Sequence, residues 1–321
     1  MTYVTKVAVL GATGQQGGAV ADALLKQENG PTVVAITRNP DSDKAKALKA
    51  AGAIVRKADL NDVESLKAAF EGCDGAFVIA NFWEGMNVDV EVQHYKNATD
   101  ALKATPTIKH VVYSTLEDSV IPGVTDDFKV LHEHETGKMY VPHFDGKNRA
   151  EKFFEGLPTT FMVTSCYFEN FTSFFTSVGN EDGSYTFTLP LSEDKKIPWT
   201  ILPDLGRLVA GAFKPELVGK RIGQASFLAT GAELAEILSK ATGKRITYQC
   251  VPWEVFASFG FPGADELAQM FELWLRTYDK FCADRAIPPQ EELMGGKVSD
   301  PVEYGKTFAD KILFQEFKKD A

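Results

Sequence analysis

Short apolar runs alternate with amphipathic segments through the first half of the chain. The apolar runs are six, at 6–10, 32–37, 53–56, 75–80, 108–114 and 159–164. Segments with helical spacing of apolar positions lie between and beside them, at 19–25, 43–51, 62–70, 88–103 and 147–155. Continuous apolar strands separated by amphipathic helices are typical of a parallel sheet that is covered on both faces. The pattern therefore predicts a doubly wound α/β domain of the Rossmann type.

The pattern changes after about residue 165. Aromatic residues crowd 167–175, and the expected elements beyond them are helices at 204–213, 231–241, 254–259 and 265–278 with a strand at 248–253. This mixed order predicts a smaller α+β C-terminal lobe over the carboxyl edge of the sheet. We expect a Rossmann domain over 1–165, with a returning segment near 197–224, and the smaller lobe over 166–321.

Composition excludes several classes of function. The chain has 34 Lys+Arg against 44 Asp+Glu, a net charge of −10, so it should repel a nucleic-acid backbone or an anionic membrane. No apolar stretch approaches the roughly 20 residues of a membrane span. The four cysteines are widely spaced, which fits a reducing compartment better than a disulfide scaffold or a zinc ribbon. A cytoplasmic location is expected, with nuclear access left open.

A metal site is not expected. His132 and His134 alternate with Glu133 and Glu135, but the segment follows a turn-rich stretch and has no third ligand nearby. We expect a solvated loop there.

The clearest motif is the glycine-rich segment 11–18, GATGQQGG, which follows the first strand and opens the first helix. Glycines at this spacing allow a tight turn and let backbone N–H groups approach a diphosphate at the positive end of the helix. The strand-loop-helix context favours dinucleotide binding. The alternative is a tight turn without a ligand.

The end of the second predicted strand favours NADP(H) over NAD(H). NAD-specific sites place a carboxylate there, whereas this chain has Arg38 and Asn39 after Thr37. The planar fork of Arg38 matches phosphate oxygens; the alternative is a solvated surface arginine. Asp59, after the third strand, is placed either to meet the adenine amine or to cap the following helix.

Six segments resemble the NmrA-like family of atypical short-chain dehydrogenase/reductase proteins, with the likeness greatest to its NADPH-sensing branch. They are Gly11–Gly18, Thr37–Pro40, Ala80–Glu84, Val112–Ser114, His143–Lys147 (HFDGK) and Cys166–Asn170 (CYFEN). The glycine element is shared with many reductases, while HFDGK and CYFEN are more specific. The likeness covers nearly the whole chain.

The resemblance implies NADP(H) binding and a regulatory role exerted through a protein partner; a homodimer is also open. The residues that it assigns to the cofactor site are Gly11, Ala12, Thr13, Gly14, Gln15, Gln16, Arg38, Asn39, Asp59, Leu60, Ala80, Asn81, Phe82, Lys147, Tyr167, Phe168, Glu169 and Asn170. The chain departs from the branch at Gln93, where a lysine is expected, so one phosphate or ribose contact is in doubt.

The candidate catalytic residues are Ser114, His143 and Lys147. Active short-chain reductases use Tyr-x-x-x-Lys, in which the tyrosine delivers a proton and the lysine holds the nicotinamide ribose. Here His143 replaces the phenol. The preferred interpretation is a regulatory redox sensor with a degenerate site, in which cofactor binding orders loops near Trp83 and over 120–139. The alternative is an NADP-dependent reductase of a quinone or carbonyl, with His143 as the acid.

Overall fold

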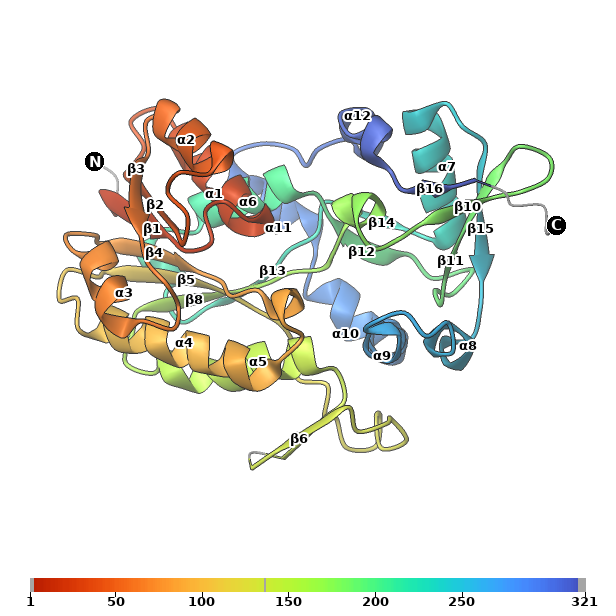
Figure 1. Ribbon diagram of the computed structural model, residues 1–321, viewed down its shortest axis with the longest axis horizontal. Coiled ribbons are helices and arrows are strands. Elements are labelled where there is room, and N and C mark those ends of the chain that lie inside the picture. The colour runs from red at the N-terminus through yellow and green to blue at the C-terminus, as the bar shows by residue number, and fades with distance from the viewer. Residues whose placement is uncertain (1–2, 136, 317–321) are drawn as a thin grey trace.

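A seven-stranded parallel sheet forms the centre of the larger part of the molecule (Figure 1). The structure is a computed structural model that describes residues 3–135 and 137–316. The strand order is β13-β8-β5-β4-β1-β2-β3, so the chain reverses direction across the sheet between β1 and β4. The strands are β1 (Lys6–Val9), β2 (Thr32–Thr37), β3 (Ile54–Lys57), β4 (Gly75–Val78), β5 (His110–Thr115), β8 (Thr159–Val163) and β13 (Arg221–Gly223). The predicted doubly wound Rossmann fold is confirmed.

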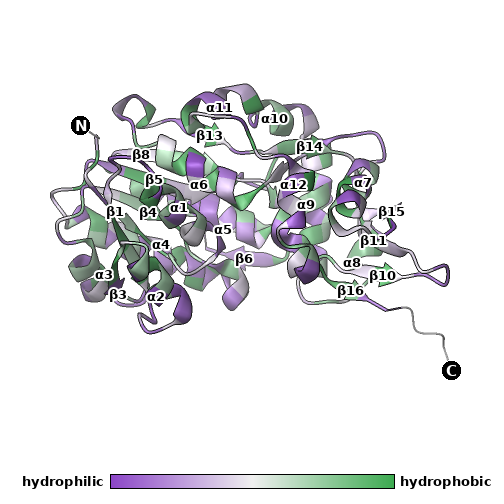
Figure 2. Ribbon diagram, turned by 90° about the horizontal axis from the view of Figure 1, so that it is seen from above, coloured by the Kyte–Doolittle hydropathy of each residue, from purple (hydrophilic) through white to green (hydrophobic). Residues whose placement is uncertain are grey.

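Helices cover both faces of this sheet (Figure 1). One face carries α1 (Gln15–Leu25), α2 (Asp43–Ala50), α6 (Leu202–Gly211) and α11 (Ile287–Met294), and the other carries α3 (Val63–Phe70), α4 (Val88–Lys103) and α5 (Pro142–Ala150). Most of these helices show both hydrophobic and hydrophilic positions (Figure 2), as expected for helices with a buried side and a solvated side. Within the described ranges, none of the helices has the length and apolar character needed to span a membrane.

Two segments beyond residue 165 return to this sheet. Helix α6 packs on α1, and β13 pairs in parallel with β8 as an edge strand. Both fall within the returning segment expected at 197–224. The limits of the two domains remain a prediction.

The contact between α1 and α6 depends on a glycine. A Cβ atom at Gly206 would lie 2.2 Å from the carbonyl oxygen of Ala19, which no side chain can tolerate. The two helices therefore meet backbone to backbone, side by side on one face of the sheet.

The C-terminal lobe combines small sheets with helices, as the sequence predicts. One sheet has the order β15-β11-β10-β16 and another β14-β12-β9. The strands are β9 (Cys166–Tyr167), β10 (Ser177–Gly179), β11 (Tyr185–Leu189), β12 (Ile197–Thr200), β14 (Phe227–Ala229), β15 (Ile246–Cys250) and β16 (Phe314–Gln315). The helices are α7 (Gly231–Thr242), α8 (Trp253–Ala257), α9 (Ala264–Arg276), α10 (Tyr278–Ala283) and α12 (Pro301–Lys306).

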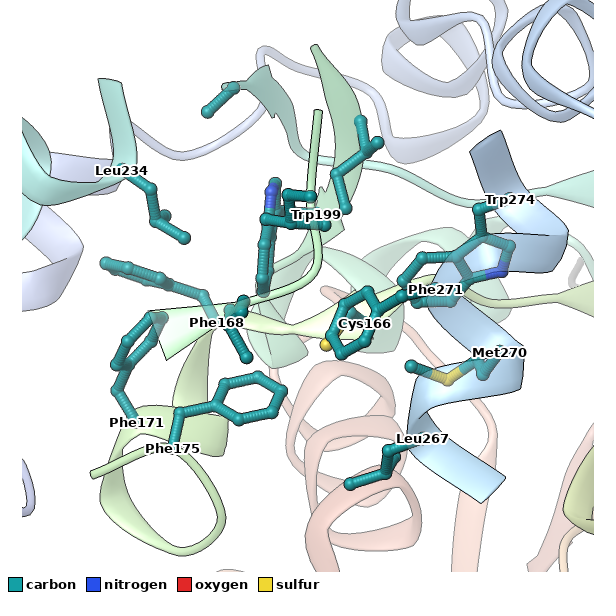
Figure 3. Close-up of a cluster of buried hydrophobic side chains, with 14 of the residues drawn as sticks. Cys166, Phe168, Phe171, Phe175, Trp199, Leu234, Leu267, Met270, Phe271 and Trp274 are labelled. Atoms are coloured by element: carbon teal, nitrogen blue, oxygen red, sulfur yellow. The ribbon is translucent and has the colours of Figure 1, made fainter. Parts of the chain in front are cut away.

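Aromatic side chains form the core of this lobe (Figure 3). Phe168 and Phe171 are fully buried and pack with Trp199 and Phe271 in one cluster. Phe168, Phe171 and Phe175 are therefore core residues, whereas Phe174 is 45% exposed.

Local departures from the sequence prediction have identifiable causes. The helix expected at 147–155 begins instead at Pro142 and ends at Ala150, because proline at the first helical position is preorganised for a helix start. The loop expected around His132 is a hairpin of β6 (His132–His134) and β7 (Gly137–Met139). Among the described residues, no three His, Cys, Asp or Glu side chains group closely enough to hold a metal ion.

The α1–α6 contact yields a stability prediction. Gly206→Ala should lower the free energy of unfolding by about 1–3 kcal/mol, because overpacking a close contact forces the helices apart. Denaturant titration measures this. Gly85→Ala is the matched control, since a Cβ there would meet nothing within 4 Å and its φ is −129°. Equal free energies of unfolding for the two variants would show that α6 can shift away from α1 without loss of stability.

A buried histidine on β5 yields a pH prediction. His110 is fully buried, its Nδ1 lacks a partner among the described residues, and burial lowers its pKa to about 4. The unfolded imidazole, with a pKa of about 6.5, takes up a proton first as the pH falls. The free energy of unfolding should therefore fall by about 2 kcal/mol between pH 7 and pH 5 on account of this group.

His110→Phe tests the assignment, because a phenyl ring can keep the edge contacts with Tyr3 and Phe213 but does not titrate. Chemical denaturation at both pH values should show a smaller pH-dependent loss for the variant. An identical loss in both proteins would rule out His110 as its source.

Candidate functional site

A cavity of about 730 Å³ lies at the carboxyl edge of the parallel sheet. Its walls come from the glycine-rich segment after β1, the segments after β2, β3 and β4, helix α5, the segment 164–175 and helix α9. Ligands of doubly wound sheets bind at this edge, where the strand order reverses. The size is within the range of small-molecule sites.

Most of the predicted site residues line this one cavity. They are Gly11, Thr13, Gly14, Gln15, Gln16, Arg38, Asn39, Asp59, Leu60, Ala80, Asn81, Phe82, His143, Lys147, Tyr167 and Asn170. The topology thus brings together residues that the resemblance alone had assigned to a shared site.

Four predicted residues lie outside the cavity lining. Ala12 and Phe168 are buried in the hydrophobic cores. Glu169 accepts hydrogen bonds from the Tyr304 hydroxyl and a backbone N–H, and Ser114 donates its hydroxyl to Gln16. Their side chains serve the structure around the cavity rather than its surface.

The start of α1 is built to face an anion. Gly11 has a φ of +60°, and a Cβ at Gly17 would lie 2.2 Å from the Gly11 carbonyl oxygen, so both positions require glycine. The helix has no side-chain cap and no acidic residue in its first turn. The first-turn N–H groups have no intrahelical acceptor, and they lie at the cavity wall. This cradle fits a diphosphate.

Gln16 links the start of α1 to Ser114 on β5 and to Tyr167 on β9. Its Oε1 accepts the Ser114 hydroxyl at 2.7 Å, and its Nε2 donates to the Tyr167 hydroxyl. Burial raises the pKa of Tyr167 to about 12, so this hydroxyl stays protonated. The hydroxyl of Ser114, one of the candidate catalytic residues, is therefore hydrogen-bonded within the protein.

The segment after β2 differs from its sequence prediction in one respect. Arg38 lines the cavity, but its guanidinium fork is not free, because Nη1 and Nη2 donate to the two Glu84 oxygens at 2.7 and 3.0 Å. The Glu84 hydrogen bond raises the pKa of Arg38. The end of β2 itself carries no carboxylate, as the sequence shows, but the fold brings Glu84 to Arg38 from the segment after β4.

Asp59 was expected either to meet the adenine amine or to cap the following helix, and the structure excludes the capping role. Helix α3 is capped by Asp62, whose Oδ1 accepts from two backbone N–H groups of the first turn. Asp59 lies at the cavity wall and accepts hydrogen bonds from the Asn61 backbone and side chain, and the backbone bond is the main cause of its lowered pKa. It is therefore available to a ligand at this end of the cavity.

At the position where the related branch has a lysine, this chain has Gln93, which does not line the cavity, whereas the next residue, His94, does. Gln93 is exposed and donates to Asn97, outside the lining. His94 does line the cavity, with its Nε2 3.1 Å from Asn61 Oδ1 and its pKa lowered by burial.

His143 and Lys147 stand one turn apart on α5, on the opposite wall. Lys147 Nζ lies 2.6 Å from Glu91 Oε1 and donates to the His143 carbonyl at 3.3 Å. Burial raises the pKa of Glu91, and the ammonium opposes that rise. Because a lysine has three N–H donors, one remains for a ligand such as a ribose hydroxyl.

His143 is held by a carboxylate from the other lobe. Its Nδ1 lies 2.6 Å from Glu266 Oε1, and its backbone N–H donates to the same oxygen at 2.7 Å. Both side chains are 7% exposed. The ring also packs on Trp83, with centroids 4.9 Å apart. The imidazole is thus fixed in orientation, and its Nε2 has no partner among the described residues.

The end of the cavity near His143 is apolar. Leu267, Met270 and Trp274 project from α9 (Figure 3), and Phe144 and Phe175 complete this wall. A flat apolar group would be stabilised here by burial.

Glu91 and Glu266 were missed by sequence reasoning, although each left a signal. Glu91 shares a buried helix face with Tyr95 and Ala98, and Glu266 shares one with Met270 and Leu273. A carboxylate at a core position of an amphipathic helix requires a buried partner. The sequence alone does not identify that partner.

The family model described as the NmrA-like family matches residues 4–304. The NmrA-like family domain-containing oxidoreductase FrzB of Cladobotryum sp is 32% identical over 308 residues, covering 88% of this chain and 87% of that protein. NmrA, described as a negative transcriptional regulator, was solved in complex with NAD and superposes with a TM-score of 0.75 at 23% identity, covering 95% of both chains.

The NADPH-dependent quinone oxidoreductase QOR2 of Escherichia coli, solved with NADPH, gives a TM-score of 0.66 at 24% identity, covering 95% of this chain and 99% of that one. These two structures share the fold. The family match and the FrzB identity confirm the resemblance to this family that was drawn from six segments of the sequence. The chain belongs to the NmrA-like family.

Proposed function

We propose that this protein is an NADP(H)-binding regulator in which the reductase site has become degenerate. The observation that carries the proposal is that the three reductase positions are all paired within the protein. Ser114 bonds Gln16, Lys147 bonds Glu91, and a histidine bonded to Glu266 replaces the phenol. The residues that bind a dinucleotide are kept, while the usual proton donor is absent.

Each part of the cavity has a role in holding the cofactor. The first turn of α1 binds the diphosphate, Arg38 and Asp59 face the adenosine end, and the third donor of Lys147 holds the nicotinamide ribose. When bound, NADPH supplies a hydride at the apolar end. NmrA was solved with NADP as well as with NAD, which supports either dinucleotide for this fold.

Regulation requires that a protein partner distinguish the empty protein from the occupied one. The cavity lies between the Rossmann sheet and α9 of the C-terminal lobe, so a bound cofactor touches both. A change in their packing would alter the surface of the protein, and a separate partner or a second copy of the chain would bind the two states differently.

A second candidate is an NADPH-dependent reductase of an apolar quinone or carbonyl compound. His143 favours it, because Glu266 holds Nδ1 and leaves Nε2 for proton transfer, and His143 lines the same cavity as the apolar side chains of α9. FrzB is named an oxidoreductase and QOR2 a quinone oxidoreductase, which agrees with this class of reaction.

Turnover separates the two candidates. We expect NADPH oxidation near background with a panel of quinones and carbonyls, because a lost general acid commonly costs about 100- to 10,000-fold in rate. Absorbance of NADPH in steady state measures it. Turnover above roughly 1 per second that disappears in His143→Ala, with NADPH binding intact, would establish the reductase instead.

The preference for NADPH over NADH tests the role of Arg38 at the adenosine end of the cavity. Arg38→Ala should weaken NADPH binding by about tenfold or more, since hydrogen bonds between charged groups contribute about 1.5–3 kcal/mol. NADH lacks the 2′-phosphate and should bind both proteins alike. Calorimetric titration of both cofactors provides the measurement. An equal loss for NADH and NADPH would assign Arg38 to the fold rather than to phosphate binding.

A further inference from the structure

The ion pair between Arg38 and Glu84 joins two separate walls of the cavity. Arg38 follows β2, and Glu84 ends the short 3₁₀ helix η1 (Phe82–Glu84) after β4. The pair is bidentate, and its side chains are 63% and 53% exposed, so a ligand entering from solvent can reach it. Both residues line the cavity.

The segment that carries Glu84 also touches the C-terminal lobe. The Trp83 ring packs on His143 and on Phe174, with centroids 4.9 and 5.4 Å apart. A Cβ at Gly263, just before α9, would lie 3.2 Å from both the Trp83 ring and the Met86 side chain. A displacement of Glu84 that moves Trp83 or Met86 would therefore change the packing at the start of α9.

The backbone of this segment is strained. Met86 has a φ of +47°, in the left-handed region that residues other than glycine rarely adopt. Such strain persists only where surrounding contacts impose it. The Arg38–Glu84 pair is one of the contacts that hold the segment 82–86.

We propose that Glu84 is a specificity-determining residue that competes with the 2′-phosphate of NADP(H) for Arg38, so that NADP(H), and not NAD(H), releases the 82–86 segment. The inference rests on the proposed cofactor binding. An arginine presents one planar fork for bidentate bonding, and Glu84 occupies it. A phosphate with nearly two negative charges takes this fork and repels the carboxylate. A neutral 2′-hydroxyl does neither.

The charges around the pair define the competition. Asp59 and His94 line the cavity beside the pair, and Lys44 on α2 is a further cation in the cavity lining. If Lys44 alone held the phosphate, Arg38 would stay on Glu84, and removing the Glu84 charge would not change selectivity. The competition is therefore testable at one residue.

Affinity provides the first test. Glu84→Gln should tighten NADP⁺ binding by about twofold to fivefold, the fold-change expected from abolishing an exposed ion pair that must be broken. NAD⁺ binding should be unchanged. Glu64→Gln is the matched control, because it removes one negative charge and an exposed pair with Lys67 on α3, outside the cavity lining. It should alter neither affinity.

Tryptophan fluorescence provides the second test, on the released segment itself. Saturating NADP⁺ should change the emission of the wild-type protein and saturating NAD⁺ should not, and the difference should vanish in Trp83→Phe. The adenine-end probes 2′,5′-ADP and 5′-AMP should repeat this contrast. In Glu84→Gln the unligated emission should already resemble that of the NADP⁺ complex.

The outcomes are distinct. Unchanged or weaker NADP⁺ binding by Glu84→Gln, or equal fluorescence responses to both dinucleotides, would overturn the inference while leaving cofactor binding in place. Failure of the wild-type protein to bind either dinucleotide would overturn the proposed function, and the inference with it.

Discussion

The close backbone contacts that hold α1 are the constraint on which the rest of the site depends. Gly17 lets the helix start against the Gly11 carbonyl, and Gly206 lets α6 press on it at Ala19. No side chain fits at either contact, so the N-terminus of α1 has a single position. Its free N–H groups then define one end of the cavity, and the other walls are placed relative to that end.

Three carboxylates assemble the remaining walls around this fixed end. Glu84 joins the segments after β2 and β4, Glu91 joins α4 to α5, and Glu266 joins the C-terminal lobe to α5. Two of these contacts are buried, where a charge without a partner is strongly unfavourable. The same groups that shape the cavity also occupy Lys147 and His143. Each carboxylate thus fixes the orientation of a side chain that lines the cavity.

The sequence predicts the repeating part of the structure well, because it is encoded locally. Apolar runs such as 32–37 give the parallel strands, and the glycine spacing of 11–18 gives the start of α1. The partners are not encoded locally: Glu266 is 123 residues from His143, and Glu84 is 46 from Arg38. Local pattern shows that a buried carboxylate needs a partner but not which one, since the fold alone brings the two segments together.

The proposed dinucleotide site has its diphosphate end at the start of α1. Calorimetric titration of the wild-type protein and of Gly14→Val with NADP⁺ tests it most directly. Gly14 lines the cavity, so a branched side chain there blocks close approach of a ligand to the backbone. We predict one site per chain in the wild type and none in the variant, with matching circular dichroism spectra. Equal binding by both proteins would contradict it.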